Sequence, residues 1–482
     1  MFLRQITDSS LAQNAYLIGC QRTGEAVVVD PERDVDRYLE VAAENGLRIT
    51  AVAETHIHAD YLSGARELME RHGAIAYLSN EGGPDWQFEW AKGHVNARFI
   101  GGGDSFRVGN IELKALLSPG HTPEHLSFLV TDHGGGATEP MALLTGDFIF
   151  VGDVGRPDLL ESAAGQTGVM EPSARTLYQS LRATAGLPEY LQILPAHGAG
   201  SACGKALGAV PGSVLGYERR FNPAFRMALE GGGDEFVREI LSGQPEPPLY
   251  FARMKRGNKR GPALLAGGQV PRPRRLTVAE LPAFLESGGI PLDLRGDRRA
   301  FMTRHVAGSL FAPMAGGRLP QVAGSYLDEA TPVLVIVSDE SLVEEATRQL
   351  IRIGQDQVAA WITADEALGP QAESAGLIRR QESITTEALA GALASHPGAA
   401  VLDVRGAGEF AGSHVAGAVN VAHTRLAARM DDIPSGRPLF VHCGSGLRAA
   451  MAVPFLAGRL QDVIYVDGAF DRIASSLKTT QS

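Results

Sequence analysis

Apolar runs alternate with amphipathic segments through the first half of the chain, and this alternation predicts an α/β fold. Residues Asn14–Gly19 and Ala26–Asp30 are short apolar runs bounded by polar residues or glycine, which is typical of paired strands. From Asp34 to Ala43 apolar side chains recur at helical spacing, and Gly46 follows where a helix would end. The run Ile49–Ala53 then predicts another buried strand.

The alternation continues to about residue 182. Helices are predicted at about Leu62–His72 and Ala174–Arg182, and strands near Ala74–Leu78, Arg98–Ile100, Ile111–Leu117, Leu126–Val130 and Ala142–Thr145. We therefore expect one α/β domain over residues 1–250.

The C-terminal part of the chain contains an internal repeat. The repeated motifs are Leu292–Gly296 followed by His305–Ser309, and Leu402–Gly406 followed by His414–Ala418. Each pair continues into an apolar run that predicts a buried strand, at Val333–Val337 and at Pro438–His442. We therefore predict two copies of one α/β fold, at residues 276–368 and 383–482.

Residues 251–275 separate the two parts and are rich in basic residues, glycine and proline. Such composition favours a solvated connector, and we predict an interdomain linker there. A second boundary is expected between Gly369 and Ser383.

The length of 482 residues fits two to four domains. Acidic residues outnumber basic ones, 55 to 44, and the net charge of -11 gives no reason to expect a nucleic-acid partner. The N-terminal sequence contains no apolar run long enough for a signal peptide or a membrane span, so we expect a cytoplasmic protein. The three cysteines, Cys20, Cys203 and Cys443, cannot form a disulfide framework.

The segment Thr55–Tyr61 carries the densest cluster of metal-binding groups. His56 and His58 are two positions apart and Asp60 follows two residues later, which places these groups on one side of an extended segment. The other members of the cluster are His121 in Ser-Pro-Gly-His-Thr, Asp147 in Leu-Thr-Gly-Asp and His197 in Pro-Ala-His-Gly. In this order the residues resemble the signature of the metallo-β-lactamase superfamily, which implies two mixed sheets face to face with helices outside.

Tyr61 bears on the number of metal ions. Binuclear hydrolases of the superfamily, such as glyoxalase II, have a histidine directly after the aspartate of the motif, where this chain has Tyr61. With one metal the expected set is His56, His121 and Asp147, a two-histidine, one-carboxylate face typical of non-haem Fe(II) oxygenases. We therefore predict one Fe(II) per chain. The other three residues of the cluster would orient the ligands or hold a second metal: His58, Asp60 and His197.

A thiol follows the strand of the second C-terminal copy, in Cys443-Gly444-Ser445-Gly446-Leu447-Arg448. In a glycine-rich turn at a helix N-terminus, backbone N–H groups favour a thiolate and bind an anion, so Cys443 is a candidate nucleophile. Only four residues separate Cys443 from Arg448, one fewer than in cysteine-dependent phosphatases, and this short loop suits a sulfane sulfur. Arg448 would hold the anionic donor or acceptor, and Gly444, Ser445 and Gly446 would contact it.

The two copies resemble tandem rhodanese domains. Asp403 and Arg405 are expected to form a structural ion pair beside the loop. When the strand ends are aligned, Asp339 falls at the position of Cys443 and Glu344 at that of Arg448, which predicts that the first copy is inactive. The role expected for this copy is that of a spacer or an oligomerisation surface.

The whole arrangement resembles bacterial fusions of a persulfide dioxygenase with rhodanese domains. The resemblance implies oxidation of a thiol persulfide by O2 to sulfite, sulfane-sulfur transfer to or from sulfite and thiosulfate through Cys443, and a role in sulfide detoxification. Arg156 is a candidate for holding the substrate carboxylate or Asp147, with Asp158 as its partner, although a surface ion pair explains them equally well. Cys203 is either a second thiol near the iron or an inert loop cysteine.

Two other functions fit the same residues. One is a metal-dependent thioester hydrolase of the glyoxalase II kind with a separate rhodanese activity, and the other is a persulfide sensor or carrier without turnover. All three take small-molecule partners, and we expect no membrane partner and a homo-oligomer.

Overall fold

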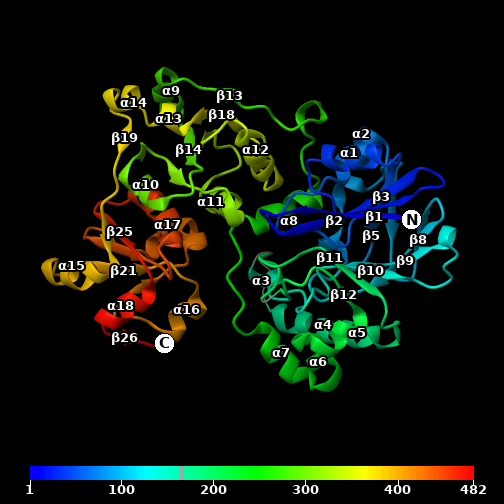
Figure 1. Ribbon diagram of the computed structural model, residues 1–482. Coiled ribbons are helices and arrows are strands. Elements are labelled where there is room, and N and C mark those ends of the chain that lie inside the picture. Colours follow the sequence, from blue (N-terminus) through cyan, green and yellow to red (C-terminus); the bar gives the residue numbers. More distant parts are fainter. Residues whose placement is uncertain (163–167, 206, 482) are drawn as a thin grey trace. The chain divides into compact units, whose positions relative to one another are not determined.

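The computed structural model describes residues 1–162, 168–205 and 207–481. The chain divides into two compact units, each described here by itself (Figure 1). The first comprises Met1–Val270 with Ile351–Gly354, and the second comprises Pro271–Leu350 with Gln355–Ser482. Among the described residues, the helices all lack the length or the apolarity that a membrane crossing needs.

Two six-stranded sheets form the centre of the first unit. The first sheet contains, in spatial order, β1 (Phe2–Asp8), β2 (Gln13–Cys20), β3 (Glu25–Val29), β4 (Arg48–Ala53), β5 (Ile75–Ser79) and β6 (Ala97–Ile100). The second contains β12 (Ser213–Val214), β11 (Gln192–Pro195), β10 (Ala142–Gly146), β9 (Leu126–Asp132), β8 (Ile111–Leu117) and β7 (Ser105–Val108). Most strands predicted from the apolar runs are therefore present, with bounds shifted by a few residues.

Alternation of side chains along the strands builds the layers of this unit. Tyr16 and Val27 pack between the two sheets, in one core with Phe128 of the second sheet. Leu17 and Val28, the neighbours of the first two, pack on the opposite face of their sheet. Helices cover the outer faces: α1 (Asp36–Glu44) and α2 (Ala65–His72) on the first sheet, and α4 (Met170–Ala183), α5 (Leu215–Phe221), α6 (Pro223–Glu230) and α7 (Gly233–Leu241) on the second. The predicted αββα sandwich is confirmed, and the short α3 (Leu159–Ser162) lies before α4.

The first part of the predicted linker is a helix, α8 (Phe251–Arg260). Phe251, Met254 and Asn258 lie on its buried face, while the basic residues that suggested a solvated connector occupy the other face. The first compact unit also extends to Val270. Residues 251–260 are therefore a helical part of the first unit, and the prediction of a solvated interdomain linker was wrong for this segment.

The second unit contains two five-stranded parallel sheets with the same strand order. The first sheet contains β13 (Arg274–Arg275), β18 (Val358–Thr363), β17 (Val333–Val337), β14 (Ile290–Asp293) and β16 (Leu310–Phe311). The second contains β20 (Ser383–Thr385), β25 (Val463–Asp467), β24 (Leu439–His442), β21 (Ala400–Asp403) and β23 (Val419–Asn420). The repeated fold predicted from the sequence is confirmed by this common order.

Each copy adds a two-stranded sheet, β15 (His305–Val306) with β19 (Ile378–Arg379), and β22 (His414–Val415) with β26 (Thr479–Thr480). The helices of the first copy are α9 (Leu281–Glu286), α10 (Arg298–Thr303), α11 (Arg318–Tyr326), α12 (Leu342–Arg352), α13 (Ala364–Ala367) and α14 (Pro370–Ser374). Those of the second are α15 (Leu389–Ser395), α16 (Ala407–Gly412), α17 (Leu447–Ala457) and α18 (Phe470–Ser476). Because β19 pairs with β15, the first copy reaches at least Arg379, beyond the predicted end at residue 368.

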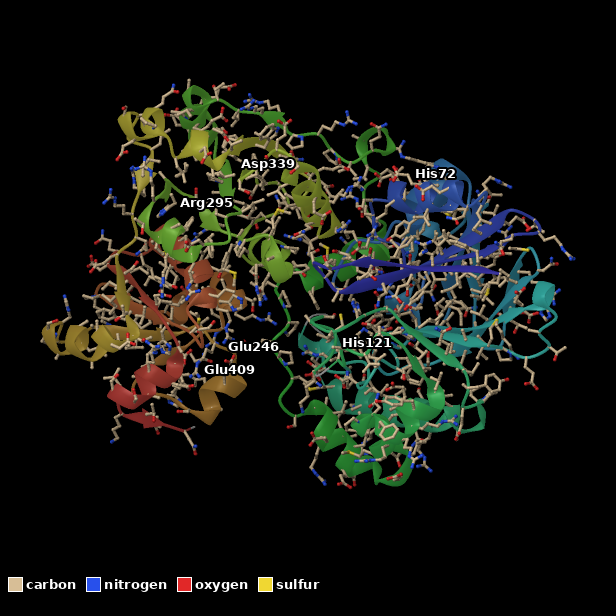
Figure 2. All side chains as sticks on the ribbon, viewed as in Figure 1. His72, His121, Glu246, Arg295, Asp339 and Glu409 are labelled. Carbon is tan, nitrogen blue, oxygen red and sulfur yellow. The ribbon has the colours of Figure 1, made fainter. Side chains whose placement is uncertain are left out.

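Strand pairing corrects the alignment of the two copies. Asp293 pairs with Ile336 in the first copy, and the equivalent Asp403 pairs with His442 in the second, so Ile336 corresponds to His442. Val337, and not Asp339, is therefore the counterpart of Cys443; Asp339 lies two residues later in the loop (Figure 2). Since α12 begins at Leu342 as α17 begins at Leu447, the counterpart of Arg448 is Val343 instead of Glu344. Valine offers neither a nucleophile nor a cation.

Candidate functional site

The residues of the predicted metal cluster follow strands that end at one edge of the two sheets. His56 and His58 come after β4, Asp147 after β10 and His197 after β11, while His121, labelled in Figure 2, lies in the loop between β8 and β9. All of these side chains are buried. Residues far apart in sequence thus meet because strands of both sheets, β4 in the first and β10 and β11 in the second, lead into the same cluster.

His56, His121 and Asp147 form one group whose ligand atoms lie within 4.8 Å of one another. Asp147 Oδ2 is 3.4 Å from Nε2 of His121 and 4.0 Å from Nε2 of His56. Both carboxylate oxygens of Asp147 are buried and, within the described part of the chain, receive no hydrogen bond. A buried carboxylate facing two imidazole nitrogens in this way fits a bound metal cation.

Hydrogen bonds at the far side of each ring orient the two imidazoles. Nδ1 of His56 lies 2.9 Å from Oγ1 of Thr55, which in turn donates to Oδ2 of Asp30 at 2.8 Å. Nδ1 of His121 donates to the backbone carbonyl of Arg156 at 3.1 Å. In both rings Nε2 is thereby left to face Asp147, as a metal ligand requires.

Burial also sets the charge state of this group. It lowers the pKa of His121 to about 3 and that of His56 well below its usual value, so both rings are neutral and can donate a lone pair. Burial raises the pKa of Asp147 to about 6, which leaves the carboxylate ionised at neutral pH. Neutral imidazoles and an ionised carboxylate are the forms that bind metals.

His58 lies beside His56, but its Nε2 has its partners outside this group. Its Nε2 lies 3.2 Å from Oδ1 of Asp30 and 3.1 Å from Oε2 of Glu54. Although burial opposes its charged form, Asp30 and Glu54 raise the pKa of His58 well above its usual value. His58 is thus part of a buried ion-paired cluster that supports the loop.

Asp60 and His197 form a second group together with Cys203. His197 Nε2 lies 3.2 Å from Oδ2 of Asp60 and 3.5 Å from Oδ1 of Asp147, so this group adjoins the first. Burial, with the nearby charges of Asp60 and Asp147, raises the pKa of the Cys203 thiol well above its usual value. Cys203 therefore lies next to the cluster as a neutral thiol.

Tyr61 and Arg156 have other partners. The Tyr61 hydroxyl donates to the carbonyl of Asp30 at 3.2 Å, so it is turned toward the first sheet. Arg156 is fully buried and pairs with both oxygens of Asp158, at 3.0 and 2.5 Å, and it donates to two backbone carbonyls of neighbouring loops. This buried ion pair connects neighbouring loops, so the alternative of a surface ion pair was wrong.

Four residues that support the metal cluster were not identified from the sequence: Asp30, Glu54, His125 and Asn258. His125 Nε2 accepts a hydrogen bond from the backbone N–H of Asp147 at 3.1 Å. Asn258 donates to the carbonyls of His58 and Tyr61 and accepts from the N–H of Ser63. An acidic residue directly after the buried strand β3 was a signal for Asp30, whereas the contacts of Asn258 depend on the folded chain.

Cys443 directly follows β24, and its loop leads into α17. The backbone N–H of Gly446 donates to Sγ of Cys443 at 3.1 Å. Gly446 has a φ of +94°, and a Cβ atom there would approach Oδ1 of Asp467 to 2.8 Å, so glycine is required. The loop thus directs at least one amide at the thiol.

Arg448 is the second residue of α17. Its guanidinium pairs with both oxygens of Glu409 on α16, at 2.5 and 2.8 Å; Glu409 is labelled in Figure 2. Arg405 pairs with Asp403 at 2.6 Å in a buried ion pair, as the sequence predicted. The loop therefore presents a thiol, an inward amide and a cation held by a carboxylate.

Comparisons with known proteins agree with this architecture. Residues 10–197 match the model of the metallo-beta-lactamase superfamily, and residues 385–476 match that of the rhodanese-like domain. A human relative, "Persulfide dioxygenase ETHE1, mitochondrial", is 30% identical over 243 residues, which cover 49% of this chain and 80% of the relative. A human hydroxyacylglutathione hydrolase-like protein is 31% identical over 182 residues, which cover 38% of this chain and 54% of that protein.

A solved structure covers a larger part of the chain. The metallo-beta-lactamase from Staphylococcus aureus subsp. aureus COL is 40% identical, with a TM-score of 0.65. The match covers 75% of this chain and 99% of that one. The chain therefore belongs to the metallo-β-lactamase superfamily, as a fusion of an ETHE1-like domain of that superfamily with a rhodanese domain.

Proposed function

We propose that the N-terminal domain is an iron-dependent dioxygenase that oxidises the terminal sulfur of a low-molecular-weight thiol persulfide to sulfite with O2. The observation that carries this proposal is the buried group of His56, His121 and Asp147, a two-histidine, one-carboxylate set. The similarity to a relative named as a persulfide dioxygenase supports it.

The residues of the domain have distinct roles in this proposal. Iron held by the three side chains would supply the redox chemistry and the open coordination positions that O2 and a sulfur ligand need. Thr55 and the Arg156 carbonyl keep the imidazoles aimed at Asp147. A cavity of about 410 Å³, lined by Tyr16, Leu207 and, of the cluster residues, His197, would give a small thiol persulfide room on the His197 side.

The C-terminal rhodanese domain would move sulfane sulfur through Cys443. With thiosulfate as donor, Sγ of Cys443 attacks the outer sulfur, the S–S bond of thiosulfate breaks, and sulfite leaves with the electron pair. The Gly446 N–H stabilises the sulfur anion, and Arg448 holds the oxyanion when it exchanges Glu409 for the substrate. The reverse reaction makes thiosulfate from sulfite.

Joining the two activities in one chain serves sulfide detoxification, because the sulfite made by the first domain is a sulfur acceptor for the second. Covalent linkage raises the effective concentration of one product near the other site.

Oxygen uptake tests the dioxygenase. The full-length protein is loaded with Fe(II) without air and then given O2 with glutathione persulfide, coenzyme A persulfide or cysteine persulfide. Equimolar consumption of O2 and formation of sulfite are expected with at least one of them, and no uptake by the zinc-loaded protein or by His121→Ala. Iron-loaded protein that consumes no O2 with any persulfide would refute the proposal.

A thioester hydrolase is the second candidate. The adjoining group of Asp60, His197 and Cys203 offers ligands for a second metal, and the hydrolase-like human relative shares the same domain. Zinc in excess of one per chain, with thioester hydrolysis, would favour this function. A carrier without turnover would bind iron and persulfide and consume no O2.

A further inference from the structure

The inactive rhodanese copy contacts the nucleophile loop of the active copy. Both copies lie in the same compact unit, with α10 of the first beside α17 of the second (Figure 1). Tyr326 of α11 stacks on Phe455 of α17 at 4.5 Å between ring centroids and donates to the carbonyl of His423 at 2.8 Å. The first copy is therefore packed directly against the second.

Arg298, at the start of α10, reaches the loop itself. Its Nη2 donates to the carbonyl of Ser445 at 3.3 Å, and its Nε donates to Oδ1 of Asp467 at 2.9 Å and to the hydroxyl of Tyr465 at 3.1 Å. The Arg298 side chain is about one-third exposed. A cation from one copy thus binds the loop that carries the thiol of the other.

The carbonyl that Arg298 binds belongs to the peptide group whose N–H faces the thiol. The Ser445 oxygen and the Gly446 N–H lie on opposite sides of one planar trans peptide. Arg298 approaches the oxygen, while the N–H donates to Cys443 Sγ at 3.1 Å. A cation at the oxygen end both fixes the peptide orientation and polarises the N–H as a donor.

The next carbonyl is held by a connected set of bonds. The Tyr465 hydroxyl lies 3.0 Å from the Gly446 oxygen and 2.9 Å from Oδ1 of Asp467, and the two oxygens share its one proton. Asp467 in turn pairs with Arg298 and, through its other oxygen, with Arg299. The carbonyls of Ser445 and Gly446 therefore both accept hydrogen bonds from side chains outside the loop. The Gly446 N–H, which lies between them along the chain, faces the thiol.

We propose that the inactive copy positions the active site, with Arg298 holding the Ser445–Gly446 peptide so that its N–H stabilises the sulfur anion on Cys443. This inference rests on the proposed sulfur transfer by Cys443. The sulfur anion is the Cys443 thiolate, the form that attacks the outer sulfur of thiosulfate, because the N–H donates to Sγ itself. Holding the N–H there therefore acts on the reactivity of the nucleophile more than on thiosulfate binding. Arg298 is a positioning residue, and Arg448 remains the anion-binding cation. The first copy is then more than the spacer that its missing nucleophile suggested.

Kinetics of thiosulfate:cyanide sulfur transfer by the full-length protein test this inference. Arg298→Ala should lower kcat about tenfold, as expected for loss of a charge-assisted hydrogen bond, with the KM for thiosulfate changed less than about twofold. Arg298→Lys, which keeps a cationic donor, should recover part of kcat. Arg274→Ala is the matched control, because it removes the same charge from an exposed site of the same copy and should leave both constants unchanged.

Two further measurements distinguish a failure of the positioning role from a failure of the proposed sulfur transfer. Tyr465→Phe should also lower kcat. In the double variant Arg298→Ala/Tyr465→Phe, the fold decrease in kcat should be smaller than the product of the two single decreases. Hydrogen exchange in peptide 443–448 should be faster in Arg298→Ala than in Arg274→Ala, a readout that needs no turnover. Equal kinetics and exchange in Arg298→Ala and Arg274→Ala, or a change confined to KM, would overturn the inference. A parent protein that forms no thiocyanate would instead count against sulfur transfer, while the exchange data would still decide the positioning role.

Discussion

Replacing Asn258 by alanine tests the structural role of α8 at the metal cluster. The side chain is buried, donates to the carbonyls of His58 and Tyr61 at 2.8 and 2.7 Å, and accepts from the N–H of Ser63 at 2.8 Å. Asn258→Ala leaves three buried backbone groups without these partners. At about 1 kcal/mol per hydrogen bond, the free energy of unfolding of the first unit should fall by about 3 kcal/mol.

The same change should weaken metal binding. Asn258 binds both ends of the segment His58–Ser63, which begins two residues after His56 and contains Asp60. Removing a residue that orients metal ligands typically lowers metal affinity by about 10- to 100-fold, and we expect a loss in that range for Co(II) or Fe(II). A fragment ending at residue 250 lacks Asn258 and should show a defect at least as large.

Urea unfolding, followed by hydrogen exchange in peptides of the first unit, measures the stability, and titration with Co(II) measures the affinity. Asn45→Ala is the control, because Asn45 is exposed and makes a single hydrogen bond to the carbonyl of Val41. A loss of stability below about 1 kcal/mol together with unchanged affinity would show that the three hydrogen bonds contribute little, and the reasoning would fail.

The remaining predictions concern three other positions. Tyr61→His should leave the metal content unchanged, because the side chain at this position is directed at the Asp30 carbonyl; an added metal ion, measured by elemental analysis, would contradict this. Cys443→Ser should still consume O2 with persulfide while its product shifts from thiosulfate to sulfite and all thiocyanate formation is lost; undiminished thiosulfate, after correction for the uncatalysed reaction, would refute the coupling of the two sites. Burial, with the charge of Arg448, lowers the pKa of His423 to about 3 from 6.5, so the unfolded state binds a proton first as the pH falls. The free energy of unfolding of the second unit should then decrease by up to about 1.4 kcal/mol per pH unit below 6.5, and His423→Gln should reduce that slope in hydrogen-exchange experiments; an unchanged slope would refute it.

The grouping of His56, His121 and Asp147 was predictable because these residue types are chemically distinctive and each follows an apolar run. Asp30, Glu54 and His125 lie close to the cluster, but a carboxylate or imidazole near a strand end reveals nothing of its partner until the strands are paired. Asn258 was hidden for a different reason. Glycines and basic residues in the segment obscured the amphipathic spacing of Phe251, Met254 and Asn258, so the helix was interpreted as a connector.

The first of the two repeated copies shows a second limit of sequence reasoning. Its repeat motifs predicted the fold, and Asp339 and Glu344 at the aligned positions predicted that it is inactive. The alignment was displaced by two residues, since only the pairing of Asp293 with Ile336 identifies Val337 as the counterpart of Cys443. The contact of Arg298 with Ser445 joins residues 147 positions apart, and no local pattern predicts such a contact.

Cys443 lies below the protein surface, with a side chain only 1% exposed. Under the proposed sulfur transfer, an acceptor would have to enter the loop to reach a sulfur atom attached to Sγ, and a small anion needs less room there than the thiol of a folded protein. The depth of the thiol would thus act as a size filter on sulfur acceptors. It would protect the stored sulfur from protein reductants and reserve it for small molecules such as sulfite.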